Sequence, residues 1–538
     1  MLCIADTLGV FQVESRAQMN FLPRMRPRTI YDLVIEVAVI RPGPIQGDMV
    51  HPFLKRRRGE EPVVYPSAAL EPVLGKTLGV PLFQEQAMQI ASVAAGFTPS
   101  EADQLRRALG TARGPGTIQK FKDRFILGCL ENGYDEDFAC AVFRQLEGFS
   151  GYGFPESHAA SFALLVYVSS WLKCHHPEVF CCALLNAQPM GFYAPAQIVR
   201  DAREHGVSIL PICVERSYWD NVLEPSETGV LGVRLGFRQI KGFREEDGGW
   251  ISAARGNGYC SIDAVWRKAG LDRTALSKLA QADAFVAQGL NRRDALWSVK
   301  GLGGEKPLPL FESLGEGTSD SLTKLPVMDL REEVFEDYIG TRLTLREHPV
   351  TLLRGDIGQT LPSKALRDTG DGAHVTVCGL VITRQRPGTA SGVIFLTLED
   401  GSSVANIVVW PNMFKLHRKV VMTGRLLKIR GKLQREGIVT HVVANHIIDM
   451  SYLLDTLGDA QSAGDNINPS LDNADEAKRP ISAKEVEQAG GKSSGNRPSP
   501  PTDRPMLPRK TVSGYYNGGG ARHPRQQANK LFPSRDFH

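Results

Sequence analysis

The sequence lacks the features that would direct it to a membrane or to an oxidising compartment. Its nine cysteines are scattered without a Cys-x-x-Cys pair, which indicates free thiols in a reducing, cytoplasmic interior. No basic segment opens the chain and Asp6 comes early, so we expect no signal peptide. The longest apolar run, Ala159 to Leu172, is too short to span a bilayer and predicts a buried helix.

A large excess of charge of one sign is also missing. Sixty-three basic residues face 59 acidic ones, and the formal net charge of +4 identifies no partner by itself. The 538 residues are enough for several domains, and 42% hydrophobic content is ordinary for a globular protein. The stretch Leu8 to Ser15 reads as a strand or turn with no preceding linker, so we expect the chain to begin inside a fold.

The densest group of glycines and aromatic residues runs from Gly148 to His158, directly before the apolar run. Glycine lets a backbone approach a ligand closely. Ser157 and His158 stand where a helix begins, and free N–H groups and the helix dipole favour an anion there. We therefore predict a phosphate-binding loop. The alternative for His158 is a capping or core histidine.

Basic residues gather in two earlier segments. Lys55 to Arg58 is either a solvated surface patch or a contact for a polyanion. The segment from Arg106 to Arg124 sets six cations against Asp123, which favours phosphate contact over a mixed solvated surface. The six are Arg106, Arg107, Arg113, Lys120, Lys122 and Arg124. Arg41 lies on a stiff Arg-Pro-Gly-Pro loop.

Cysteines and histidines lie close together after the apolar run, at Cys174, His175, His176, Cys181 and Cys182. Their spacing fits no usual zinc-ligand pattern, and free cysteine is commonly buried. We therefore expect no metal site there.

Two later segments are typical of nucleic-acid contact. Lys241 and Gly242 lie in an apolar-Lys-Gly-apolar turn that resembles a helix-hairpin-helix, with Leu271 to Phe285 as its second half, although such turns are common. Beyond Val375, five β-rich segments predict an OB-fold barrel. Lys428, Arg430 and Lys432 alternate along the fourth segment and share one face. Such a barrel binds single strands or serves protein contact alone.

Several motifs together resemble one family. They are Thr7 to Arg16, Arg41 to Pro44, Phe83 to Gln86, Leu105 to Gly110 and Gly151 to His158. They are similar to the fingers region of bacterial C-family DNA polymerases, the family of the DNA polymerase III alpha subunit. Four further stretches resemble the error-prone, damage-tolerant paralogues of the ImuC type. These are Gln188 to Tyr193, Arg384 to Gly388, Leu396 to Asp400 and Phe532 to His538.

The resemblance implies a multidomain α+β protein with mostly α-helical fingers, a helix-hairpin-helix region, a five-stranded OB-fold barrel and a disordered C-terminal tail. The implied domains follow in chain order. They are the end of the palm and start of the fingers (1–50), fingers (51–230), helix-hairpin-helix region (231–300), linker with helices (301–370), OB-fold (371–452), and tail with a short terminal motif (453–538).

The resemblance also implies roles for residues. The incoming nucleotide would meet Arg106, Arg107, Gly151, Tyr152, Ser157 and His158. DNA would meet Arg41, Lys55, Arg56, Arg57, Arg113, Lys120, Lys241, Gly242, Lys428, Arg430 and Lys432. The palm aspartates that hold two Mg²⁺ ions in this family have no match here, so no catalytic residue and no metal ligand is assigned.

Two functions follow as hypotheses. The first is an error-prone, DNA-directed DNA polymerase for damage-induced translesion synthesis, repair and replication, of which this chain carries the nucleotide- and DNA-binding half. Its partners would be a DNA primer-template, dNTP, a translesion accessory protein and the sliding clamp, with Mg²⁺ as cofactor of the complete enzyme. The alternative is a non-catalytic DNA-binding module that recruits partners to a translesion complex.

Overall fold

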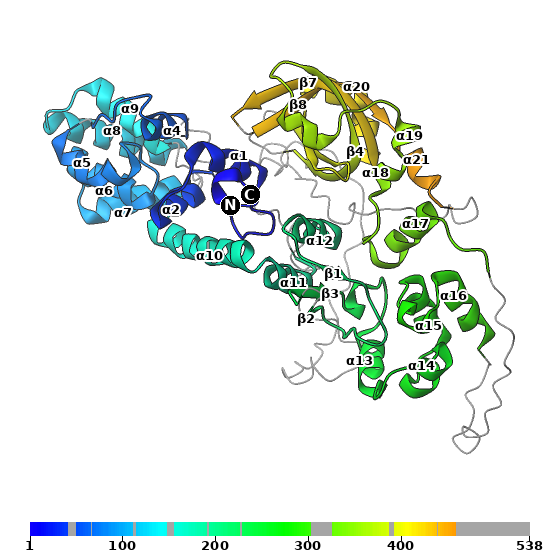
Figure 1. Cartoon of the computed structure of the whole chain (residues 1–538). Coiled ribbons are helices and arrows are strands. Elements are labelled where there is room, and N and C mark those ends of the chain that lie inside the picture. Colours follow the sequence, from blue (N-terminus) through cyan, green and yellow to red (C-terminus); the bar gives the residue numbers. More distant parts are fainter. Residues whose placement is uncertain are drawn as a thin grey trace, which may run out of the picture.

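The computed structural model describes residues 1–40, 50–65, 67–110, 115–147, 155–190, 193–225, 229–302, 325–386, 392–437 and 439–458. The multidomain α+β fold predicted from the sequence is confirmed: helical lobes and a β-barrel follow one another along the chain (Figure 1). Among the described residues, no helix combines the length and apolarity needed to cross a bilayer. The predicted disordered tail lies outside the described residues from 459 onward.

The start of each of the first two α-helices is set by its N-cap residue. Two helices form here, α1 (Arg16–Met25) and α2 (Ile30–Val39), because Ser15 and Thr29 each begin one. Each cap forms a capping box, with Gln18 and Asp32 respectively, which satisfies backbone N–H groups of the first turn. After a short 3-10 turn, η1 (Leu2–Ile4), the N-terminal residues pack with these helices.

A separate helical lobe follows, with its own core built around Phe125 and Phe143. Gly96, at φ +64°, ends one helix and allows the next to return alongside it. The elements of this lobe are α4 (Val50–Arg58), η2 (Ala68–Leu70), α5 (Glu71–Leu74), η3 (Gly75–Thr77), α6 (Gln84–Ala95), α7 (Pro99–Gly110), α8 (Pro115–Glu131) and α9 (Glu136–Glu147).

Helix α10 (Glu156–His175) connects this lobe to the rest of the molecule (Figure 1). Its buried residues form a narrow stripe with 4-3 spacing, made of Ala159, Ala163, Val166, Ser170 and Lys173. The prediction of a buried helix is therefore wrong for most of its circumference. Large apolar side chains on the opposite face are exposed, including Leu164 (56%) and Val168 (47%), because no described element covers that face.

The next part joins a small sheet to the helix-hairpin-helix region in one core. In the sheet, the order is β1-β3-β2, with β1 parallel and β2 antiparallel to β3. The elements are α11 (Pro177–Ala187), α12 (Pro195–Glu204), β1 (Ile209–Leu210), β2 (Val222–Pro225), β3 (Leu231–Arg234), η4 (Phe237–Gln239), α13 (Glu245–Ala254), α14 (Ile262–Ala269), α15 (Arg273–Gln281), η5 (Val286–Gln288) and α16 (Arg292–Gly301).

The five predicted strands close into a barrel of order β4-β5-β6-β8-β7, in which β4 also pairs with β7. This is the OB-fold connection, with a helix between the third and fourth strands. The strands are β4 (His374–Gln385), β5 (Ile394–Glu399), β6 (Val404–Val409), β7 (Leu426–Glu436) and β8 (Val439–Asp449). The flanking helices are α17 (Leu330–Thr341), α18 (Pro349–Leu352), α19 (Arg354–Ile357), η7 (Ser363–Arg367), α20 (Pro411–Thr423) and α21 (Tyr452–Asp455).

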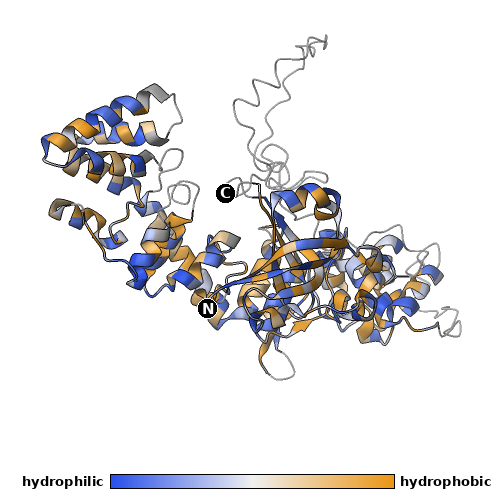
Figure 2. Ribbon diagram, turned by 90° about the horizontal axis from the view of Figure 1, so that it is seen from above, coloured by the Kyte–Doolittle hydropathy of each residue, from blue (hydrophilic) through white to orange (hydrophobic). Residues whose placement is uncertain are grey.

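Helix α17 is the joint between the helix-hairpin-helix region and the barrel. The fully buried Arg292 of α16 pairs with Glu333 and Asp337 of α17, and Arg346 pairs with the same two acids and with Asp283. Apolar residues of α17 pack with barrel residues in one cluster. Hydrophobic residues are distributed over all parts of the ribbon (Figure 2), as expected for several cores rather than one.

Candidate nucleic-acid interface

The start of α10 is fixed by two neighbouring helices. Glu156 accepts a hydrogen bond from the Tyr31 hydroxyl of α2 (2.7 Å), and its backbone N–H donates to Oε2 of Glu85 in the first turn of α6 (2.9 Å). Ser157 and His158 follow in the first turn, at the predicted helix start, and both are exposed. The centre of the His158 ring lies 4.2 Å from that of Phe162. One N–H of the helix start is thus already capped by a carboxylate, while His158 faces outward.

Arg106 and Arg107 lie near the end of α7 and share one acid. Their guanidinium groups bind the two oxygens of Asp103, each at 2.8 Å, and Arg107 remains 73% exposed. These arginines hold the pKa of Asp103 below its ordinary value, chiefly through the hydrogen bond from Arg106. Because α6 and α7 form a hairpin joined by three residues, the end of α7 returns toward the start of α6, where Glu85 contacts α10. The two arginines and His158 therefore lie at the same end of the lobe.

The basic segment of α4 divides into two kinds of side chain. Lys55 is exposed, as is Lys120 of α8. Arg56 donates to the Leu78 carbonyl (2.8 Å), and Arg57 binds the Met25 carbonyl and Asp32, both at 2.7 Å. These two arginines tie α4 to its neighbours, so the structure gives them a packing role, and DNA contact by them stays a prediction. Arg41, Arg113, Gly151 and Tyr152 lie outside the described residues.

The predicted glycine hairpin lies between η4 and α13. Gly242 has φ +68°, and both Lys241 and Gly242 are exposed. The Lys241 N–H donates to the Gly340 carbonyl of α17 (2.8 Å), and Lys278 of α15 donates to the Gly242 carbonyl (2.5 Å). Residues 271–285 therefore do pack against the hairpin, as predicted, and place a second lysine beside Lys241.

The cations of β7 alternate as predicted. Arg430 and Lys432 are exposed between inward-facing Ile429, Gly431 and Leu433, and Lys428 is half-buried. The Lys428 ammonium donates to the Ile357 carbonyl at the end of α19 (2.8 Å), so it anchors that helix to the barrel. Arg430 and Lys432 are the members of the set that face solvent.

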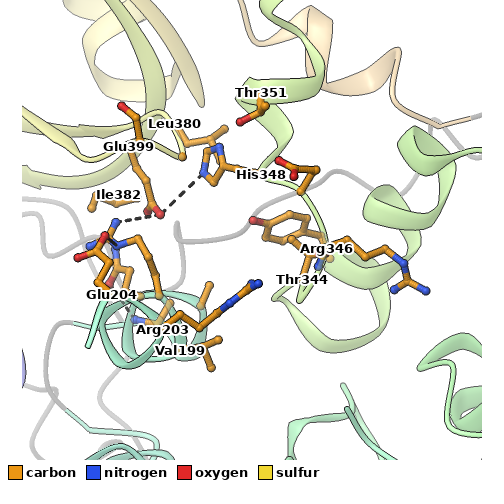
Figure 3. Close-up of a pocket in the computed structure, with 18 residues that line it drawn as sticks. Val199, Arg203, Glu204, Thr344, Arg346, His348, Thr351, Leu380, Ile382 and Glu399 are labelled. Carbon is orange, nitrogen blue, oxygen red and sulfur yellow. Dashed lines mark hydrogen bonds and ion pairs between the residues drawn. The ribbon is translucent and has the colours of Figure 1, made fainter. Parts of the chain in front are cut away.

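A cavity of about 380 Å³ was not foreseen from the sequence (Figure 3). It lies where α12, the α17–α18 connection and the barrel meet. Arg200 of α12 pairs with Glu399 of β5 at 2.8 Å, and His348 Nε2 lies 3.8 Å from the same carboxylate. Burial lowers the pKa of His348, which favours a neutral ring. Side chains from three segments that are distant in the sequence line this cavity, so no local sequence pattern could predict it.

One group of described residues has the geometry to hold a cation, namely Asp6, Asp201 and His205. The ammonium of the buried Lys173 lies 2.9 Å from both Asp6 and Asp201, so a cation of the protein itself already pairs with both carboxylates. Burial alone would raise the pKa of Asp6, but Lys173 and His205 hold it below its ordinary value. The group does not fit Mg²⁺, which prefers oxygen ligands and retained water.

Comparison with known proteins accounts for this arrangement. Residues 1–133 match the model of the bacterial DNA polymerase III alpha subunit finger domain, residues 206–295 the helix-hairpin-helix motif, and residues 375–449 the OB-fold nucleic acid binding domain. An error-prone DNA polymerase from Ruegeria pomeroyi is 56% identical over 541 residues, covering 100% of this chain and 46% of that protein. This chain belongs to the family of the bacterial DNA polymerase III alpha subunit.

Two further relatives show similar identity and similarly partial coverage of their own length. An error-prone DNA polymerase from Sinorhizobium medicae is 52% identical and covers 89% of this chain and 45% of its own length. One from Brucella abortus is 54% identical and covers 84% of this chain and 43% of its own length. The chain thus spans less than half the length of these curated relatives.

Proposed function

We propose that this chain supplies the nucleotide- and DNA-binding part of an error-prone, DNA-directed DNA polymerase that acts in damage-induced translesion synthesis. The observation that carries the proposal is the match to relatives named error-prone DNA polymerase, which extends over 100% and 89% of this chain. The separate finger, helix-hairpin-helix and OB-fold matches support it. We further propose the domain boundaries given above, a cytoplasmic location, and a translesion accessory protein and sliding clamp as partners.

In this proposal the described residues bind and orient, and the reacting metals are held elsewhere. Divalent metal ions supply charge stabilisation in nucleotidyl transfer when bound. Arg106 and Arg107 meet the triphosphate, because guanidinium forks match phosphate geometry and both groups reach solvent at one end of the lobe. Ser157 and His158, at the start of α10, form the adjoining wall.

DNA is held by contacts that do not read sequence. Lys241 and Lys278 flank the Gly242 hairpin, where a backbone phosphate meets two ammonium groups. Lys55, Lys120, Arg430 and Lys432 are exposed cations that add to the phosphate contact.

The nucleotide role is tested with the complete polypeptide that carries this sequence. Charge reversal of both arginines, Arg106→Glu with Arg107→Glu, is expected to raise the apparent KM for dNTP in Mg²⁺-dependent primer extension. Arg144→Glu, an exposed arginine of α9 in the same lobe, is the matched control and leaves KM unchanged. An unchanged KM in the double variant removes the two arginines from the nucleotide site.

The claim that this chain binds DNA but does not hold the catalytic metal ions is tested by primer extension with the 538-residue chain alone. Incorporation is expected to stay at background, while the same chain still binds primer-template DNA. Incorporation above background by this chain would overturn the claim that the metal-binding carboxylates lie elsewhere. Absence of any DNA binding by this chain would contradict the proposed function itself.

A further inference from the structure

The N-terminal segment, residues 1–14, is held by a polar cluster between two parts of the fold. Apolar residues of this segment share a hydrophobic core with α1, α2 and α10, whereas α11 and α12 belong to the core of the helix-hairpin-helix region. Asp6 of the segment meets Lys173 near the end of α10 and His205, which caps the end of α12. The cluster therefore bridges the two cores, where the start of the chain passes α12 (Figure 1).

The ring of His205 has an acceptor oxygen at each of its nitrogens. Nε2 lies 2.7 Å from Oδ2 of Asp6, and Nδ1 lies 2.7 Å from the backbone carbonyl oxygen of Asp201. The carbonyl can only accept, and so can the Asp6 carboxylate, which is paired with the Lys173 ammonium at 2.9 Å. A neutral imidazole has one N–H, so its lone pair would face one of these oxygens. Both contacts are satisfied together by the imidazolium, which has two N–H donors.

The charge balance of the cluster also requires the imidazolium. Asp6 and Asp201 contribute two negative charges, and Lys173, which is 1% exposed, contributes one positive charge. The His205 imidazolium supplies the second positive charge. Loss of its proton leaves one excess negative charge in a half-buried cluster and removes a donor that holds Asp6.

The other titratable groups around the cluster do not replace this charge. Cys181 of α11 and Tyr193 face Asp201, and burial raises the pKa of both side chains, so both stay neutral near pH 7. Glu204, the next acid of α12, pairs with Arg200 at 3.4 Å. His205 is thus the group of the cluster whose protonation changes its balance of charge near neutral pH.

The pKa of His205 follows from its contacts. Burial alone would lower it, but the hydrogen bonds to the Asp201 carbonyl and to Asp6 hold it above the ordinary 6.5. The contribution of His205 to stability is therefore complete below about pH 6.5 and is lost as the pH rises through the folded-state pKa. Burial also raises the pKa of Asp201, although Lys173 opposes this shift, so Asp201 adds a pH-dependent contribution of the same sign.

We propose that His205 is a proton-dependent latch: as an imidazolium it holds the N-terminal segment between α10 and α12, and loss of its proton releases the segment. The latch acts without nucleotide or DNA, so it goes beyond the proposed function and is tested separately from it. It makes the firmness of the joint between the two cores depend on pH.

The test follows hydrogen exchange of peptides from residues 1–14 and from α12 between pH 6 and 9, with each rate divided by the intrinsic rate. Glu14→Gln is the background throughout, because burial raises the pKa of Glu14 to about 7 in the same segment. In this background, protection is expected to fall by up to about tenfold per pH unit above pH 6.5, because opening releases the His205 proton. Adding His205→Gln should remove most of this fall. Adding His374→Gln instead, at an exposed position of β4, is the matched control and should leave the fall unchanged.

An NMR titration of histidine-labelled chain measures the protonation of His205 directly. In the Glu14→Gln background the ring is expected to keep its proton above pH 6.5. Asp6→Asn should lower the pKa of His205, because a neutral amide attracts the imidazolium less, and this variant serves if His205→Gln fails to fold. Parallel exchange profiles with and without His205→Gln overturn the latch, and so does a pKa of His205 that Asp6→Asn leaves unaltered.

Discussion

Glu14 illustrates how burial sets the charge of a single residue. Burial raises the pKa of its carboxyl to about 7, and the described residues offer it no basic partner that would oppose this shift. In the unfolded chain this carboxyl loses its proton near pH 4.5, and in the native state it loses it near pH 7. Unfolding between these two pH values therefore releases a proton. The contribution of Glu14 to the free energy of unfolding therefore falls as the pH rises from about 4.5 to 7.

Glu14→Gln removes the titrating group while keeping its shape. We expect the variant to be more stable than the parent at pH 8, by roughly 1–3 kcal/mol, and to equal it near pH 4. Urea unfolding across this pH range measures the difference. A parent and variant with parallel pH profiles would show that Glu14 is ionised in the native state.

Lys173 illustrates the opposite case, a buried charge that is fully paired. It contacts Asp6, Asp201 and the Leu8 carbonyl, while its side chain is 1% exposed. Lys173→Met removes the ammonium that pairs with both Asp6 and Asp201 and leaves His205 as their neighbour, which we expect to cost about 3–5 kcal/mol of unfolding free energy. Lys300→Met, at an exposed position, should change it by less than about 0.5 kcal/mol. Equal unfolding midpoints for the two variants would contradict this account.

At the scale of elements, α10 shows two faces of one helix. Val166 is fully buried against α2, and Val168, two residues further, is 47% exposed. We expect Val166→Ala to destabilise the α2–α10 pair by roughly 1–3 kcal/mol and Val168→Ala by less than about 0.5 kcal/mol. Hydrogen exchange of the α2 and α10 amides measures both. Similar effects of the two substitutions would mean that the outer face is covered in solution.

The structure shows which features of the fold can be predicted from the sequence and which cannot. The barrel strands were predicted correctly, because alternation and Gly-containing turns are local signals. The burial of α10 was predicted wrongly, because an apolar run does not say which elements lie around it. Arg57 looked like a surface cation, yet it caps the carbonyl end of α1, a partner 32 residues away. Helix α17 lies within the predicted linker with helices (301–370), and its contacts with Arg292 and with barrel residues join segments distant in sequence, so no local pattern predicts them.

At the scale of the whole molecule, the barrel is attached to α12 by polar contacts around a cavity. Arg200→Met removes the cation that pairs with Glu399, and we expect faster hydrogen exchange in α12 and β5 with the barrel core unaffected. Arg203→Met, on the same helix and bound to the Leu345 carbonyl, should have a smaller effect. Equal exchange in the two variants would show that apolar contacts alone hold the barrel in place.

Closure of the barrel has a consequence for how the molecule associates with others. A closed sheet has no edge strand, so no foreign strand can extend it by backbone pairing. Among the described residues, open edges belong to β1, which is two residues long, and β2, which ends in Pro225. Both are poor templates for strand addition. Self-association of this chain is therefore expected to proceed through helix packing on α10. The expected products are reversible oligomers with helical circular dichroism spectra rather than amyloid-like fibres.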